Sequence, residues 1–135
     1  MVKTIVVGVD GSPDSGRAVE WACELAQQVG ARVIAVHAVG LLEHELGDPG
    51  GEHLRPQLAG WTAPLDQLGA DRVERRLVAG DPVGAVGQVV TECSADLVVV
   101  GTRGSGTRHG ERLGSTSLHL AEACPCALVI VPRAE

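Results

Sequence analysis

Four short apolar runs limit most strongly what this chain can fold into, because each is apolar at nearly every position. They occupy residues 4–10 (TIVVGVD), 32–38 (RVIAVHA), 97–101 (LVVVG) and 128–131 (LVIV). Continuous rather than alternating hydrophobicity is typical of strands that helices cover on both faces of a parallel sheet. The four runs therefore predict central strands of a parallel α/β sheet.

A fifth run, residues 72–78 (RVERRLV), is rich in β-branched residues but carries more charge. Charged side chains are tolerated where a strand has one free edge in water. We therefore predict an edge strand here, with Arg72, Arg75 and Arg76 in solvent.

Helical patterns lie between the strands. Ser12 and Pro13 supply a capping hydroxyl and a first-turn proline for a helix that ends near Gly30, and Asp81 with Pro82 begins another. A short last helix is predicted over residues 115–123. Between residues 39 and 69 the pattern weakens: glycines mark a loop near residues 47–51, and residues 52–68 are expected to be helical despite two prolines and a glycine.

This alternation predicts an α/β fold in which a doubly wound, parallel, five-stranded sheet carries helices on both faces. The length of 135 residues fits one domain, residues 1–135. In such sheets ligands bind beyond the carboxyl ends of the strands, where the winding reverses. Asp10 and Gly101 are the residues expected there.

Composition excludes several classes of function. The net charge of −6 disfavours binding to DNA or anionic lipid, and two tryptophans without tyrosine or phenylalanine leave no aromatic surface for stacked bases. The first apolar run is too short for a secretion signal or a membrane span, and four unevenly spaced cysteines form no disulfide framework. We expect a cytoplasmic protein that binds neither nucleic acid nor membrane.

A glycine-rich segment between Gly101 and Gly114 follows the fourth apolar run. It contains five glycines and three arginines against one glutamate. Backbone amides of such a segment, followed by a helix N-terminus, suit a phosphate group. The chain has a single lysine, Lys3, and no GxGxxG, which excludes the P-loop and the dinucleotide-binding motif.

The spacing Gly101-x2-Gly104-x9-Gly114-Ser115 resembles the nucleotide-binding signature of the universal stress proteins. The resemblance extends along the chain through VGVDGS, AVHA, AGDP, ADLVVVGTRG and CPCALVIVP. It implies the strand order 3-2-1-4-5, a homodimer, and ATP held between the first and fourth strands.

The resemblance also implies a set of nucleotide-binding residues. Asp10 would lie near the sugar or a bound Mg²⁺, and Ala38 would touch adenine. Arg103 and His109 are added because of their charge and their place in the glycine-rich segment. The full set is Val9, Asp10, Ala38, Val100, Gly101, Arg103, Gly104, His109, Gly114, Ser115 and Thr116.

We therefore expect an ATP-binding, dimeric stress-response regulator that pairs through its C-terminal strand and serves an unidentified protein partner. One alternative is a slow Mg²⁺-dependent ATPase, although no catalytic base is evident. Another is a dimeric interaction module whose nucleotide site is vestigial. No residue is assigned a catalytic role.

Two further features have a structural and a functional interpretation. His37 lies in a strand, where a hydrogen-bonded core residue is expected rather than a base. Cys124 and Cys126 would face the same way on a strand, which would suit a redox or metal site. Metal sites need three or four ligands, and no partner with suitable spacing exists, so small buried thiols are expected.

Overall fold

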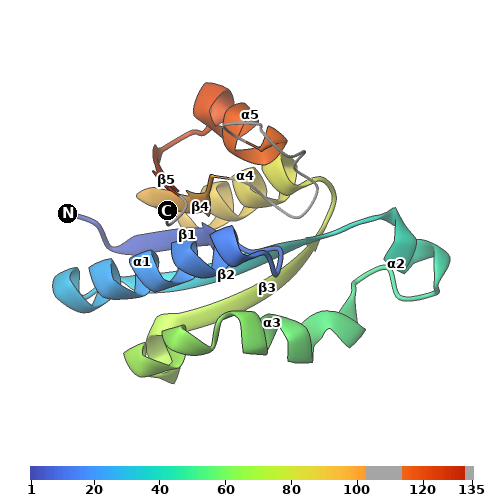
Figure 1. Ribbon diagram of the computed structural model, residues 1–135, viewed down its shortest axis with the longest axis horizontal. Helices are drawn as coiled ribbons and strands as arrows, with labels where there is room; N and C mark the ends of the chain where they lie inside the picture. The colour runs from blue at the N-terminus through green and yellow to red at the C-terminus, as the bar shows by residue number, and fades with distance from the viewer. Residues whose placement is uncertain (103–113, 133–135) are drawn as a thin grey trace.

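The computed structural model describes residues 1–102 and 114–132. Its sheet has five parallel strands in the order β3-β2-β1-β4-β5 (Figure 1), which confirms the predicted α/β fold and strand order. The strands are β1 (Thr4–Gly8), β2 (Arg32–Val39), β3 (Val73–Ala79), β4 (Leu97–Gly101) and β5 (Ala127–Val131).

The helices between the strands cover both faces of the sheet. Each face has its own buried cluster, one under α1 and α3 and the other under α4 and α5. The α-helices are α1 (Pro13–Val29), α2 (Leu41–Glu45), α3 (Arg55–Trp61), α4 (Pro82–Cys93) and α5 (Ser115–Ala123). No helix within the described ranges combines the length and apolarity needed to cross a bilayer.

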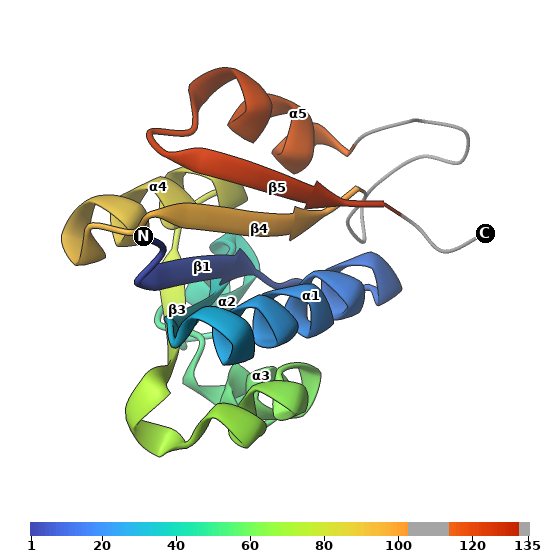
Figure 2. The same ribbon diagram turned by 90° about the vertical axis from the view of Figure 1, so that its left-hand side faces the viewer.

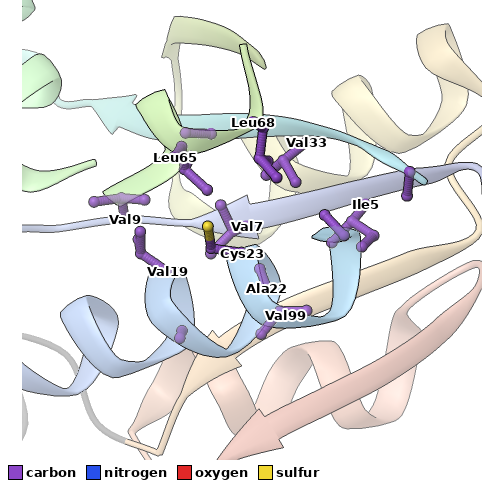
Figure 3. Close-up of a cluster of buried hydrophobic side chains, with 14 of the residues drawn as sticks. Ile5, Val7, Val9, Val19, Ala22, Cys23, Val33, Leu65, Leu68 and Val99 are labelled. Atoms are coloured by element: carbon purple, nitrogen blue, oxygen red, sulfur yellow. The ribbon is translucent and has the colours of Figure 1, made fainter. Parts of the chain in front are cut away.

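Residue alternation along the strands explains why the apolar runs are continuous. In β1, Ile5 and Val7 enter the cluster under α1, whereas Val6 enters the cluster under α4. All three side chains are fully buried. Figure 3 shows the first cluster, where Val7 and Val99 of neighbouring strands lie beside Ala22 and Cys23 of α1.

The predicted helix ends are confirmed. Ser12 caps α1 by accepting a hydrogen bond from the Ser15 amide at 3.2 Å, and Asp81 caps α4 by accepting one from the Gly84 amide at 3.0 Å. Gly30 ends α1 with a φ of 76°, a left-handed conformation that favours glycine. These caps fix where each helix starts relative to the preceding strand.

The first strand ends earlier than predicted. The prediction extended it to Asp10, but β1 ends at Gly8. The chain turns after Val9, because the Asp10 carboxylate accepts the Ser12 amide at 2.9 Å and Gly11 takes a φ of 81°. This turn moves Asp10 out of the strand and to the end of the sheet.

The middle segment is partly as predicted. Residues 52–68 are helical but broken into a 3₁₀ turn (Glu52–Leu54), α3 and a second 3₁₀ segment (Ala63–Leu68). The break lies at Thr62, whose φ of −113° leaves the helical region one residue before a segment that begins with Ala63 and Pro64. Helix α2 and the 3₁₀ turn Ala70–Arg72 were not predicted.

The arginines of the edge strand are not simply solvated. β3 does lie at the sheet edge, but Arg72 sits just before it and donates to the carbonyls of Ala26 and Ala31 at 2.6 and 2.9 Å. Arg75 donates to the Thr62 hydroxyl at 2.6 Å. The prediction was wrong on this point because these side chains tie the strand to the elements that cover it.

Candidate functional site

A pocket lies at the carboxyl ends of β1, β2 and β4. Figure 2 shows the arrowheads of β1, β4 and β5 pointing to the side where α1 and α5 begin. Parallel strands and their following helices therefore bring backbone ends and helix N-termini to one edge of the sheet. The residues that line the pocket are Gly8, Val9, Asp10, Ser15, Val36, His37, Ala38, Pro82, Val86, Val100, Gly101, Thr116 and Ser117.

The pocket has an apolar side and a polar side. Val36 and Ala38 of β2 and Val86 of α4 all belong to or pack against the cluster under α4. The polar side consists of Asp10 with hydroxyl groups that include Thr116. An apolar wall beside a few convergent polar groups is typical of a site for a small, partly aromatic and partly charged ligand.

Asp10 is held in place by the turn between β1 and α1. Its Oδ1 accepts the Ser12 amide, as described above, and its own amide lies 3.4 Å from the Ser15 hydroxyl. The preceding carbonyl, of Val9, lies 2.7 Å from Nδ1 of His37. That short contact needs a proton on Nδ1, because a carbonyl only accepts hydrogen bonds. His37 is therefore a hydrogen-bonded structural residue, as the sequence predicted.

Trp61 of α3 packs against the same turn. It lies on the face of the sheet that α1 and α3 cover, whereas the apolar wall of the pocket lies on the face that α4 covers. A Cβ atom built on Gly11 would lie 2.7 Å from two indole carbons, so the ring occupies the space that any larger residue would need. The indole also packs edge-on against His37, with ring centroids 5.2 Å apart. The segment that was hardest to interpret in the sequence thus supports the turn that carries Asp10.

Gly101 at the end of β4 is required by helix packing. A Cβ atom at this position would lie 2.6 Å from the backbone carbon and oxygen of Asp14, in the first turn of α1. Its carbonyl accepts a 2.6 Å hydrogen bond from the buried hydroxyl of Ser117. The sequence predicts a phosphate site in the segment that begins at Gly101, and the structure adds a separate reason for glycine at this position, which is the close approach of α1.

The two residues that flank the segment 103–113 are joined beside the pocket. The Gly114 amide donates to the Thr102 carbonyl at 2.8 Å, and the Thr102 amide donates to the Val131 carbonyl at 3.1 Å. Gly114 is also the N-cap of α5. The first turn of α5 is therefore fixed at the ends of β4 and β5, with Thr116 and Ser117 lining the pocket.

The structure brings together most of the predicted site residues. Gly114 and Ser115 lie directly before Thr116 but do not line the pocket, and Ser115 is exposed. Arg103, Gly104 and His109 lie outside the described residues. The predicted residues that line the pocket are Val9, Asp10, Ala38, Val100, Gly101 and Thr116.

Several lining residues were missed. Val36 lies two positions before Ala38 and therefore on the same face of β2, and Pro82 and Val86 are four apart on α4. The two-residue period of a strand, counted back from Ala38, predicts Val36. The helical spacing of four, counted from the start of the helix at Asp81 and Pro82, predicts Pro82 and Val86. The remaining missed residues are Gly8, Ser15, His37 and Ser117.

The chemistry of the site suits a metal ion only together with a ligand. Among the described residues no group of three or more His, Cys, Asp or Glu side chains could hold a metal. Mg²⁺ is commonly held by one or two carboxylates, water and substrate phosphates. Asp10 fits the carboxylate part of such a site, and the phosphates would have to supply the rest.

Comparison with known proteins identifies the family. The sequence model described as the universal stress protein family matches residues 1–132. A Thermus aquaticus relative, the universal stress protein in the QAH/OAS sulfhydrylase 3′ region, is 35% identical over 136 residues, which cover 97% of this chain and 99% of that protein. The chain belongs to the universal stress protein family.

Solved structures agree with the fold. A universal stress protein in complex with cAMP is 30% identical, covers 96% of this chain and 97% of its own, and superposes with a TM-score of 0.77. The universal stress protein UspA from Lactobacillus plantarum is 22% identical, with a TM-score of 0.83 over 96% of this chain and 97% of its own. The second similarity supports the fold alone.

Proposed function

We propose that this chain binds an adenine nucleotide, ATP with Mg²⁺, in the pocket at the carboxyl end of the sheet, and that it acts as a dimeric nucleotide-dependent regulator in stress response. The observation that carries the proposal is the union in one pocket of an apolar wall, a carboxylate and the start of α5. The relative that was solved with cAMP supports the adenine part of the ligand.

Each part of the nucleotide has a suitable surface. The base would lie against Val36, Ala38 and Val86, where apolar side chains exclude water. Asp10 would hold the ribose or Mg²⁺. The phosphates would extend toward Gly101 and Thr116, because the first amides of a helix lack intrahelical acceptors and attract anions. Arg103, Gly104, His109, Gly114 and Ser115 would complete the phosphate site.

Ligand-induced stabilisation of nucleotide-free protein tests the proposal. At one hundred times Kd, a ligand that binds only the folded chain stabilises it by about 2.7 kcal/mol. We expect ATP with Mg²⁺ to raise Tm and GTP to raise it much less. Titrating ADP, AMP and cAMP beside ATP shows how much binding comes from the phosphate tail. The absence of a shift with every adenine nucleotide would contradict the proposal.

A matched pair of variants locates the site. Ala38→Phe places a large ring on the wall proposed for the base, whereas Ala79→Phe places the same ring at the exposed end of the neighbouring strand β3. We expect Ala38→Phe to abolish the ATP-induced shift and Ala79→Phe to retain it. Equal shifts in the two variants would place the ligand elsewhere.

We propose that the homodimer forms through β5. The Val131 carbonyl accepts a hydrogen bond from the Thr102 amide, so the amide and carbonyl of Val131 face β4. Successive residues of a strand direct these groups to opposite sides, and the amides and carbonyls of Ile130 and Leu128 therefore point away from the sheet. Within residues 1–102 and 114–132 no strand pairs with this outer row of β5, and a second copy of the chain can do so. Ile130→Pro removes one outward amide without removing a bond to β4.

Sedimentation of the wild-type protein and of two variants at Ile130 tests this interface. We expect wild-type dimers, and monomers for Ile130→Pro. Ile130→Ala, which truncates the same side chain but keeps the amide, should remain dimeric. A monomeric wild type, or dimers in the proline variant, would contradict pairing through β5.

A further inference from the structure

The outer edge of β3 is open. β3 is the last strand of the sheet beyond β2, and in the part of the chain that the structure describes no strand pairs with its other side (Figure 1). The Gly80 amide donates to the Val39 carbonyl at 3.1 Å, so the backbone at Gly80 faces β2. Successive residues of a strand direct their backbone groups to opposite sides. The residues of β3 whose amides and carbonyls therefore point away from the sheet are Val73, Arg75, Leu77 and Ala79.

An open groove follows this edge. Residues 74–79 of β3 line it together with Arg55 of α3 and with Gln88 and Glu92 of α4. Helices α3 and α4 cover opposite faces of the sheet, so the edge of β3 lies between them. A free row of backbone groups inside a groove is the geometry in which an extended peptide adds a strand to a sheet.

The side of the groove toward α4 has an excess of negative charge. Arg76 donates to the carboxylates of Glu74 and Glu92, at 2.8 Å in each case. One guanidinium is thus shared by two carboxylates, and the side chains of Glu74 and Glu92 are 43% and 49% exposed. One negative charge stays unbalanced, and a basic side chain of a partner can neutralise it.

The side of the groove toward α3 is balanced. Arg75 pairs with Asp66 at 2.8 Å, and Arg55 pairs with Glu52. The apolar side chain of Leu77 lies on this same face, since it packs against the cluster under α1 and α3. Neutral, β-branched side chains of a neighbouring strand suit such a surface.

The two edge strands of the sheet differ in polarity. β5, the edge proposed above for the homodimer, is apolar throughout Ala127–Val131, whereas residues 74–76 of β3 are all charged. The thiols that precede β5, of Cys124 and Cys126, are partly exposed, so the prediction of small buried thiols was wrong. If copies of the chain paired through both edges, the sheets would join into an open fibre without end. The edge of β3 therefore suits a different protein.

We propose that the outer edge of β3 binds an extended segment of another protein, which adds a strand to the sheet and carries lysine or arginine at alternate positions. Successive side chains of a strand point to opposite faces. Every second side chain of the segment therefore reaches Glu74 and Glu92, and the side chains between them lie beside Leu77. No residue of this groove lines the nucleotide pocket, so binding of the segment requires no nucleotide.

Selection from random dodecapeptides displayed on phage tests the proposal. The target is the full-length, nucleotide-free chain. We expect enrichment of peptides that have lysine or arginine at every second position and β-branched residues between them. Failure to enrich any peptide would overturn the proposal, as would a consensus with acidic residues at every second position.

Two substitutions of Leu77 locate the bound peptide. Leu77→Pro removes an outward amide and no bond to β2, whereas Leu77→Ala truncates the same side chain and keeps the amide. Fluorescence anisotropy of the most enriched peptide measures Kd. We expect Leu77→Pro to raise Kd about tenfold, because a hydrogen bond is lost and the proline ring obstructs the partner strand. Leu77→Ala should raise it less than about threefold. Equal Kd values for the wild type and both variants would place the peptide elsewhere and overturn the proposal.

Glu92→Lys tests the charge and leaves the strand intact, so it decides the question even if Leu77→Pro does not fold. We expect it to raise Kd about tenfold, and Glu20→Lys, the same change at an exposed position of α1, to leave Kd unchanged. Equal effects of the two lysines would overturn the assignment. Sedimentation at increasing protein concentration tests the other occupant. Assembly of the wild type beyond a dimer that Leu77→Pro abolishes would mean that a second copy fills the edge, and would also overturn the proposal.

Discussion

The two ends of the same sheet are built in opposite ways. At the amino end, the Asp96 carboxylate accepts the amides of Lys3 and Thr4 at 2.8 and 2.9 Å, and the Asp96 amide donates to the Thr4 carbonyl at 2.9 Å. The Arg32 amide donates to the Lys3 carbonyl at 3.0 Å. At the carboxyl end, Asp10 and Thr116 instead line a pocket.

The difference shows how one sheet separates stability from binding. At the amino end, the backbone amides and carbonyls named above are hydrogen-bonded to other groups of the protein. At the carboxyl end, turns and helix starts place polar groups around a space. Substitutions at the carboxyl end should therefore change both stability and ligand binding, whereas substitutions at the amino end should change stability alone.

Gly101→Ala should have the largest effect on stability. The new Cβ would overlap the Asp14 backbone, and neither β4 nor α1 can move without disturbing the core. We expect unfolding free energy to fall by about 3 kcal/mol, as in severe overpacking. Urea denaturation measures it.

A second alanine serves as the control for that variant. Gly87 lies inside α4 with no atom near the position of a Cβ, so Gly87→Ala should leave stability unchanged or raise it by about 0.5 kcal/mol. A similar loss in both variants would mean that close packing at Gly101 is not what the carboxyl end requires.

Trp61→Ala should have the next largest effect. It removes the ring that covers Gly11 and packs against His37. We expect a loss of about 2 kcal/mol, below the usual value for a fully buried tryptophan. Because the turn at Asp10 loosens, the apparent Kd for ATP with Mg²⁺ should also rise.

Trp21 provides the matched control, since its side chain is 36% exposed on α1. Trp21→Ala should cost less stability and leave the ATP affinity unchanged. If nucleotide affinity were the same in both tryptophan variants, α3 would have no part in positioning Asp10.

Ser117→Ala should have a smaller effect. The variant leaves the buried Gly101 carbonyl without the hydroxyl that donates to it at 2.6 Å. The loss should be about 1 kcal/mol, the usual net value of one such hydrogen bond. Thermal and urea unfolding measure it, and Ser115→Ala is the control because Ser115 is exposed and lies only two residues before Ser117. Equal effects would argue against an ordered contact between α5 and β4.

The fold was predictable because its signals are local. Apolar runs such as residues 97–101 and caps such as Ser12 and Asp81 act within a few residues, so sequence patterns reveal them. The segment 52–68 was harder, because its buried Leu58 and Leu65 favour helix while the chain around Thr62 interrupts it.

The site was predictable only where strands end. Asp10 and Gly101 follow from the rule that ligands bind beyond carboxyl strand ends, and Ala38 follows from the resemblance to the universal stress proteins. The support that Trp61 gives to Gly11 joins residues fifty positions apart, and no local pattern indicates such a contact. The prediction for Arg75 was wrong for the same reason, since its partner Thr62 lies thirteen residues earlier, between α3 and the 3₁₀ segment that follows it.

Lowering the pH should weaken the amino end, with the smallest effect of the four. The amides of Lys3 and Thr4 donate to the Asp96 carboxylate and hold its pKa below the usual 3.8. A carboxyl group whose pKa is lower in the folded chain contributes stability above the unfolded pKa, and that contribution is lost as the pH falls through the folded pKa. The Tm advantage of wild type over Asp96→Asn should therefore be constant above about pH 5 and shrink below about pH 4.

His53 lowers the pKa of Asp48 in the same direction, so the comparison is repeated in an Asp48→Asn background. A Tm advantage that does not change with pH would mean that the ionised Asp96 carboxylate does not stabilise the amino end. If Asp96→Asn changed the ATP affinity at neutral pH, the amino end would affect ligand binding as well as stability.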